Sequence, residues 1–386
     1  MKAKHSHSLI RLVGPLVLIF SLAVSLWVVS SPADAVSSAS TSKPPSFVAR
    51  LRPLLLAKMQ ELSVPGAIVY VNDPGQGTWT TSLGTRSEAP GAPMQVRSYM
   101  RVGSITKTFT ATVILQLVDQ HKLGLDDPVS TYLSHVPNGM HITIRELLNM
   151  TSGLFSYTED LGFEKQAWGT DPFKVWTPQE LLAIAYKHPP DFPPGEGWHY
   201  NNTNYILLGL LIEQRTHLSL EQALQHYLFE PLDMHQTGVP SRTSAAIPDP
   251  HPRGYSLLLP GRTQPVDATG WNPSWGWAAG SAISTVHDLK IWAKALATGQ
   301  LLSAKTQQER LEWVPQSSPF RYGLGMMNAV GFLGHTGQLP GFQSSMFYRP
   351  KDGATMIVLV NLDAAPNGST PADILAFGVI YNALFA

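Results

Sequence analysis

Ser104 and Lys107 are the residues of this chain whose types and spacing point most directly to chemistry. They lie three positions apart within residues 101–109, and on a helix residues at i and i+3 share one face. A serine hydroxyl is a weak nucleophile at neutral pH and needs a neighbouring base. A lysine amine can be that base when burial lowers its pKa. The same spacing also recurs by chance, so the pair needs further support.

A second polar group follows about a hundred residues later. Tyr200 and Asn202 lie within residues 199–209, between a loop rich in proline and glycine and an apolar stretch. A tyrosine hydroxyl can relay a proton, and an asparagine amide can bind both a lysine and a substrate carbonyl. In the alternative interpretation Asn202 caps a helix and Tyr200 is a core aromatic. On these residues alone the alternative interpretation is favoured.

A third group precedes the last strands of the chain. Residues 334–342 are rich in glycine and contain His335, Thr336, Gly337 and Gln338. Glycine allows a substrate backbone to approach, an edge strand can pair with a peptide-like substrate, and a backbone N–H can face an oxyanion. These four are therefore candidate substrate-binding residues. The alternative is an ordinary glycine-rich turn.

A buried helix must position the serine and the lysine. Residues 109–118 are apolar on more than one stripe, which is typical of a helix surrounded by protein. We expect this helix to end near Gly124, because glycine suits a left-handed C-cap. Ser104 is then expected in the first turn, where free backbone N–H groups favour developing negative charge.

Strands are expected at both ends of the chain and helices between them. Four runs of strand-forming residues make two predicted hairpins: 66–71 with 78–83, and 342–348 with 354–361. Helix-start signals occur at Thr143, Thr177, Ser219 and Thr370. Further helices are expected at 47–62 and 284–299, and the helix that follows Thr370 is expected to cover 371–385. This order predicts an α/β fold of the α+β type, in which an antiparallel sheet built from both termini is flanked by helices and carries a helical insertion.

We expect one domain at residues 47–386. Its α/β part is expected at about 47–103 and 280–386, and its helical part at about 104–279. The chain has 386 residues and a formal net charge of +0, with no Lys/Arg-rich run, so its charge gives no reason to expect nucleic acid as a partner. It has no cysteine, which excludes disulfides, thiolate metal sites and a cysteine nucleophile.

The N-terminus predicts export. Three basic residues precede the apolar run 12–29, which is followed by Ala33-Asp34-Ala35. This pattern is typical of a secretory signal peptide at 1–35, cut after Ala35 and followed by a linker at 36–46. The alternative is an uncleaved membrane anchor. Either interpretation places the folded part outside the cytoplasm, as a secreted or cell-envelope protein.

Taken together and in this order, the three motifs resemble those of the serine β-lactamase and penicillin-binding protein superfamily. The chain looks most like secreted D-alanyl-D-alanine carboxypeptidases, class C β-lactamases and related esterases. The resemblance covers roughly residue 64 to the C-terminus. It also includes the segments 123–129, 147–154 and 322–325, the last of which reads Tyr-Gly-Leu-Gly.

The resemblance implies a role for each motif. Ser104 would be the acylated nucleophile, Lys107 its proton acceptor and Tyr200 the relay to the leaving group, although the general base in such enzymes is either the lysine or the tyrosine. Asn202 would position the lysine and the substrate. The N–H groups of Ser104 and Gln338 would form the oxyanion hole. No metal or organic cofactor is implied. His335 stands where many members have lysine, and an unperturbed histidine would titrate near pH ~6.5.

One departure from the family pattern leaves the substrate open. Some members carry an arginine after Tyr-Gly-Leu-Gly that binds a substrate carboxylate, whereas here Met326 and Met327 follow. Trp271, Trp275 and Trp277 are either walls of an apolar acyl pocket or core and surface aromatics. D-Ala-D-Ala peptides, β-lactams and small esters all remain candidate substrates. A non-catalytic wall-binding or β-lactam-sensing module on the same fold is the alternative to an enzyme.

Overall fold

The computed structural model describes residues 43–87, 92–259, 261–314 and 320–386. The predicted export signal at 1–35 lies outside these residues, as does most of the predicted linker at 36–46. Within the described ranges, no helix combines the length and the apolar character needed to cross a membrane.

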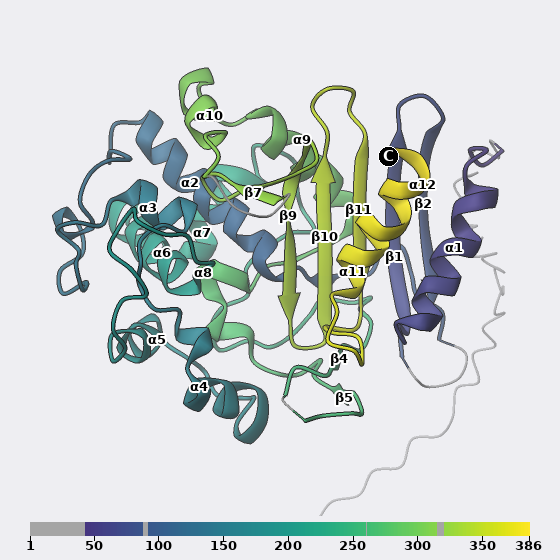
Figure 1. Ribbon diagram of the computed structural model, residues 1–386, viewed down its shortest axis with the longest axis horizontal. Helices are drawn as coiled ribbons and strands as arrows, with labels where there is room; N and C mark the ends of the chain where they lie inside the picture. Colours follow the sequence, from purple (N-terminus) through teal and green to yellow (C-terminus); the bar gives the residue numbers. More distant parts are fainter. Residues whose placement is uncertain (1–42, 88–91, 260, 315–319) are drawn as a thin grey trace, which may run out of the picture. The chain divides into compact units, whose positions relative to one another are not determined.

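A seven-stranded antiparallel sheet runs through the domain (Figure 1), in the order β2-β1-β11-β10-β9-β8-β7. Its strands are β1 (Gly66–Asp73), β2 (Gly77–Gly84), β7 (Phe320–Tyr322), β8 (Met327–Ala329), β9 (Phe332–Leu339), β10 (Phe342–Tyr348) and β11 (Thr355–Val360). Two small ladders join β3 (Met100–Arg101) to β6 (Ile283–Ser284) and β4 (Tyr255–Ser256) to β5 (Val266–Asp267). Both predicted hairpins are confirmed, and β1 pairs directly with β11, so the two ends of the chain share one sheet.

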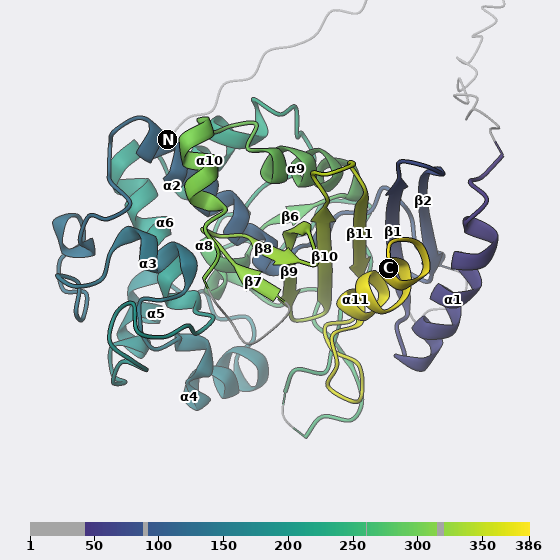
Figure 2. The same ribbon diagram turned by 45° about the horizontal axis from the view of Figure 1, so that its top comes forward.

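Helices cover both faces of the sheet (Figures 1 and 2). On one face lie α1 (Val48–Glu61), α11 (Pro371–Asp373), the π-helical segment η7 (Ile374–Tyr381) and α12 (Asn382–Leu384). On the other face lies α9 (Val286–Thr298). Strand β11 is continuously apolar because helices cover both of its faces. Val358 faces the first group of helices, whereas Ile357 and Leu359 face α9.

The remaining helices form the helical part beside the sheet. They are α2 (Thr106–Asp119), α3 (Ile144–Asn149), α4 (Leu161–Lys165), α5 (Pro178–Ala185), α6 (Asn202–Thr216), α7 (Leu220–Leu224), α8 (Trp277–Gly280) and α10 (Ala304–Arg310). Short 3-10 and π-helical turns are η1 (Gly103–Ile105), η2 (Val129–Thr131), η3 (Tyr157–Glu159), η4 (Gln166–Thr170), η5 (Gln225–Phe229) and η6 (Pro273–Trp275). The helix starts predicted at Thr143, Thr177 and Ser219 are confirmed, each with a capping box.

Helix α2 is the central element, packed against α6, α8 and β9. It is buried over most of its length, which confirms the expectation from its apolar stripes. Two details of the prediction are wrong. Ser104 lies in the 3-10 turn η1 just before α2 rather than in its first turn. The helix ends at Asp119, and His121, with φ of 54°, takes the left-handed conformation expected of Gly124. The amide of Gly124 is instead bound by the carboxylate of Asp127.

The closing helix also differs from its prediction. Thr370 stands at the N-cap position, but its side chain makes no capping hydrogen bond. The predicted single helix at 371–385 is divided into α11, the wider π-helical turns of η7 and α12, which ends at Leu384. The change of helix type lies beyond what an apolar sequence pattern specifies.

Candidate active site

Ser104 lies in a tight turn that rests directly on strand β9. The turn η1 leads into α2, and its first residue, Gly103, has φ of 53°. A Cβ atom on Gly103 would overlap the backbone nitrogen of Gln338 and lie 2.9 Å from its carbonyl oxygen. A Cβ atom on Gly337 would likewise overlap the carbonyl of Val102. These two glycines bring the backbones of Ser104 and Gln338 together, as an oxyanion hole requires.

Lys107 is fully buried beneath Ser104. Its Nζ lies 3.1 Å from Ser104 Oγ, 2.6 Å from Asn202 Oδ1 and 2.8 Å from the carbonyl oxygen of Ala279. None of these three partners is a carboxylate. Burial therefore lowers the pKa of Lys107 well below its usual range, because the charged amine is poorly solvated there. The amine is favoured in its neutral, proton-accepting form.

The Asn202 side chain is free to contact Lys107 because Asn201, and not Asn202, caps helix α6. The Asn201 side chain accepts a hydrogen bond from the amide of Asn204 and thereby caps α6. The interpretation of Asn202 as the cap is therefore wrong. Its Oδ1 accepts from Lys107, and its Nδ2 donates to Thr158 Oγ1 at 2.9 Å. Both ends of the amide are held, which fixes the lysine's position.

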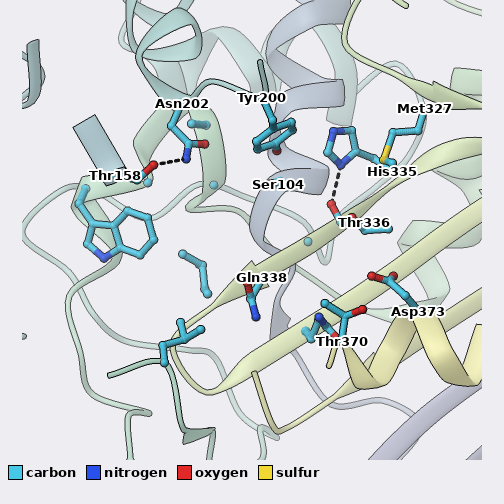
Figure 3. Close-up of a pocket in the computed structure, with 18 of the residues that line it drawn as sticks. Ser104, Thr158, Tyr200, Asn202, Met327, His335, Thr336, Gln338, Thr370 and Asp373 are labelled. Atoms are coloured by element: carbon cyan, nitrogen blue, oxygen red, sulfur yellow. Dashed lines mark hydrogen bonds between the residues drawn. The ribbon is translucent and has the colours of Figure 1, made fainter. Parts of the chain in front are cut away.

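Tyr200 presents a neutral phenol beside Ser104 (Figure 3). Its hydroxyl oxygen is buried, and no group in the described residues meets it with full hydrogen-bond geometry. Burial raises the pKa of Tyr200, and the nearby Ser104 hydroxyl partly opposes the shift. Lys107 Nζ lies 4.7 Å from the centre of the tyrosine ring. The hydroxyl, the amine and the phenol expected from the sequence thus lie together.

His335 does not behave as an ordinary histidine. It is 1% exposed, its Nδ1 lies within hydrogen-bond distance of the Thr336 carbonyl, and its Nε2 lies 2.9 Å from the Tyr322 hydroxyl. A neutral ring that donates to the carbonyl and accepts from the phenol satisfies both contacts. Burial lowers its pKa to about 3 and outweighs the hydrogen bond to the Thr336 carbonyl, which favours the charged form. The value near 6.5 that an unperturbed histidine would have therefore does not apply to His335.

Strand β9 offers an open edge to the cavity. Strand β8 pairs with β9 only at residues 332–334, whereas β10 pairs with it along 333–339. Among the described strands, residues 335–338 therefore have a partner on one side only. On the other side Thr336, Gly337 and Gln338 line the same cavity as Ser104. The Gln338 side chain is turned away to donate to the carbonyl of Asp363 at 2.6 Å, which leaves the backbone of β9 beside Ser104.

These groups line a cavity of about 450 Å³. Aromatic side chains form part of its wall, namely Trp168, Trp198, Tyr200 and Trp275. Of the three tryptophans singled out in the sequence, only Trp275 reaches it. Trp277 is buried in the core against Gly209, and Trp271 lines a separate surface hollow. The acyl-pocket interpretation therefore applies to one of them.

The sequence did not identify several residues that line the cavity or contact its groups. They are Thr158, Trp168, Trp198, Asp373 and, behind His335, Tyr322. Tyr322 belongs to the Tyr-Gly-Leu-Gly segment, so that motif carried a signal. Thr158 and Trp168 lie in the short turns η3 and η4, Trp198 lies in a loop, and Asp373 lies in α11. Met327 lines the cavity, and its described wall contains no arginine. Within the described residues, no cluster of three or more His, Asp or Glu side chains is placed to hold a metal.

The burial of His335 predicts that the folded protein loses stability in acid. The pKa of His335 is about 3 in the folded protein and about 6.5 in the unfolded chain, so between these values only the unfolded chain binds the proton. Stability is then lost as the pH falls below about 6.5, by up to about 1.4 kcal/mol per pH unit. Urea unfolding of the wild type and His335→Gln between about pH 6 and 4 should show the steeper loss in the wild type. Parallel losses would contradict this account.

Comparison with known proteins gives relatives over most of the chain. The family described as Beta-lactamase matches residues 51–377. A D-stereospecific amidohydrolase from a Streptomyces species is 36% identical, with a TM-score of 0.75 over 85% of this chain and 98% of its own. D-amino acid amidase from Ochrobactrum anthropi SV3, in complex with L-phenylalanine amide, is 27% identical, with a TM-score of 0.71 over 86% of this chain and 95% of its own.

A penicillin-binding protein from Bacillus halodurans is also similar, at 26% identity, with a TM-score of 0.69 over 81% of this chain and 97% of its own. The first curated relatives are longer than this chain. The matched region covers 60 to 61% of their length. These similarities confirm the resemblance and the fold expected from the three sequence motifs.

Proposed function

Because this chain belongs to the β-lactamase family, whose fold is that of serine hydrolases, we propose that it hydrolyses amide bonds through an acyl-enzyme on Ser104. The observation that carries the proposal is the set of contacts around the buried Lys107 amine. These contacts bring together residues of α2, α6 and α8, which lie far apart in the sequence.

Lys107 is assigned as the general base that activates the serine. A neutral amine has two N–H donors and one lone pair. Asn202 Oδ1 and the Ala279 carbonyl only accept, so they occupy the two donors. The lone pair then faces Ser104 Oγ at 3.1 Å and can take its proton as the oxygen attacks the substrate carbonyl.

Tyr200 is assigned as the group that protonates the leaving amine. Burial raises its pKa, so the phenol keeps its proton until the departing nitrogen needs one. The proton held by Lys107 then returns to the phenol oxygen as the C–N bond breaks. Hydrolysis of the acyl-enzyme reverses these transfers with water in place of the amine. The water gives a proton to Tyr200 as the phenol passes its own proton to Lys107, and Lys107 returns a proton to Ser104 Oγ as the ester bond breaks. The oxyanion of each step would lie between the N–H groups of Ser104 and Gln338.

We propose an amide of an apolar amino acid as the substrate, with D-configuration at the acyl residue. The tryptophans of the cavity wall suit an apolar acyl side chain. The D-amino acid amidase and D-stereospecific amidohydrolase among the similar structures support the D-configuration. A D-Ala-D-Ala carboxylate is less well matched, because the described wall offers it no arginine and His335 is neutral. The N-terminal export pattern supports action outside the cytoplasm.

A labelling and turnover experiment tests the proposal. A fluorescent fluorophosphonate should modify the wild type, map to the peptide that contains Ser104, and fail to modify Ser104→Ala. D-phenylalanine amide should then be turned over faster than its L-isomer, a D-Ala-D-Ala peptide, nitrocefin or a p-nitrophenyl ester. Labelling that persists in Ser104→Ala would refute the assignment. Acylation without turnover of any of the five compounds would favour a sensing module instead.

A further inference from the structure

The cavity has two chemically different sides. Thr158 and Asn202 lie at one side, whereas Asp373 and Thr370 lie at the other, beyond Thr336 (Figure 3). Asp373 is the one carboxylic acid among the residues that line the described cavity. None of the proposed catalytic steps uses this carboxyl group.

The Asp373 carboxyl group has no charged partner among the described residues. Its Oδ1 is buried without a hydrogen-bond partner in the described part of the chain, while the side chain remains partly exposed to the cavity. The hydroxyls of Thr370 and Ser345 lie close enough to favour the ionised form, but burial dominates and raises the pKa of Asp373 to about 7. An incompletely satisfied buried carboxylate is costly unless a partner arrives.

In the described part of the chain, the elements that α11 packs on supply no such partner. Helix α11 packs on β10, β11 and η7, whose sequences contain no Asp, Glu, Lys, Arg or His. Their titratable side chains are Tyr348 and Tyr381. Besides Asp373, the titratable groups that line the cavity are Tyr200 and the neutral His335. Lys107 lies behind Ser104, where its three contacts and its lowered pKa favour a neutral amine.

We propose that Asp373 binds a positively charged group on the leaving-group portion of the substrate, and so determines which amides are cleaved. Its place beside Thr336 puts it on the His335 side of the cavity. The ring of Tyr200, the proposed proton donor to the leaving amine, lies 6.1 Å from the ring of His335. An amine that leaves toward Tyr200 therefore extends past Thr336 toward Asp373. This inference rests on the proposed amide hydrolysis.

Two isosteric substrates isolate the contact. D-phenylalanine 2-aminoethylamide and D-phenylalanine propylamide share the same acyl part. The leaving amine of the first ends in an ammonium group, and that of the second ends in a methyl group. We expect kcat/KM for the wild type to favour the ammonium compound by about tenfold, as for a hydrogen bond to a charged group. In Asp373→Asn the ratio should fall to about one. The ratio in Asp233→Asn, a change at an exposed aspartate, should match the wild type.

The pH dependence tests the same contact without any substitution. Because Asp373 ionises at a pH of about 7, the preference of the wild type should rise with pH between about 6 and 8. A ratio of one at every pH, or an equal ratio in Asp373→Asn, would overturn the proposal. So would a preference for D-phenylalanylglycine that grows at low pH and is lost in Asp373→Asn, since Asp373 would then donate to a carboxylate. Failure to cleave any of these amides, with Ser104 still labelled, would count against the proposed amide hydrolysis instead.

Discussion

Replacing Lys107 with methionine is expected to slow acylation of Ser104 by about 10²–10⁴-fold, the usual contribution of a positioned general base. Methionine fills much of the same volume but has no lone pair to accept the serine proton. The oxygens of Asn202 and Ala279 that contact the amine would lose a donor. Each loss costs about 1–3 kcal/mol, so the variant should melt at a lower temperature yet remain folded.

The measurement is the rate of labelling by a fluorescent penicillin or fluorophosphonate, with circular dichroism to verify folding. Lys165→Met is the matched control, because it removes an exposed lysine and should leave the rate unchanged. In the wild type the rate should rise with pH through the lowered pKa of Lys107, since the deprotonated amine is the active form. A folded Lys107→Met protein that acylates within about tenfold of the wild type would show that Lys107 is not the base.

Gly103→Ala is expected to reduce kcat by about 10²–10³-fold, as for the loss of one oxyanion-hole donor. Gly103 has φ of 53°, and the new Cβ would overlap the backbone nitrogen of Gln338. The turn that carries Ser104 must then move away from β9, which separates the two N–H groups proposed to bind the oxyanion. The left-handed backbone adds about 1–2 kcal/mol of strain.

Gly331→Ala separates the clash from the strain. Gly331 also has a positive φ, of 86°, but a Cβ atom there would meet no heavy atom within 4 Å. This variant should lose stability without losing kcat. Steady-state kinetics on D-phenylalanine amide and thermal unfolding of both variants provide the comparison. Equal kcat in Gly103→Ala and Gly331→Ala would mean that the contact between η1 and β9 does not shape the reaction.

Most of the fold followed from local signals in the sequence. Turn residues between apolar runs predicted both hairpins, and the capping boxes at Thr143, Thr177 and Ser219 fixed three helix starts. The end of α2 did not follow, because His121 adopts the left-handed conformation while Gly124 serves the contact with Asp127. Such a choice depends on tertiary contacts that a helix-end signal does not contain.

The candidate site was predictable where three short motifs carried it and not elsewhere. Those motifs predicted that Ser104, Lys107 and Tyr200 belong to one site, and the structure places their side chains together. The charge state of His335 was not predictable, since it depends on burial and on Tyr322. Asp373 was missed because an aspartate in the first turn of a helix ordinarily has a structural explanation.

The pairing of β1 with β11 has a consequence for how the protein is made. A ribosome releases Ser104, Lys107 and β1 early, but β9, β10 and β11 emerge only near the end of translation. Until then β1 can pair only with β2 and lacks β11, and the turn η1 has no strand to rest on. The nascent chain therefore carries its proposed nucleophile well before the last strands can complete the candidate site around it.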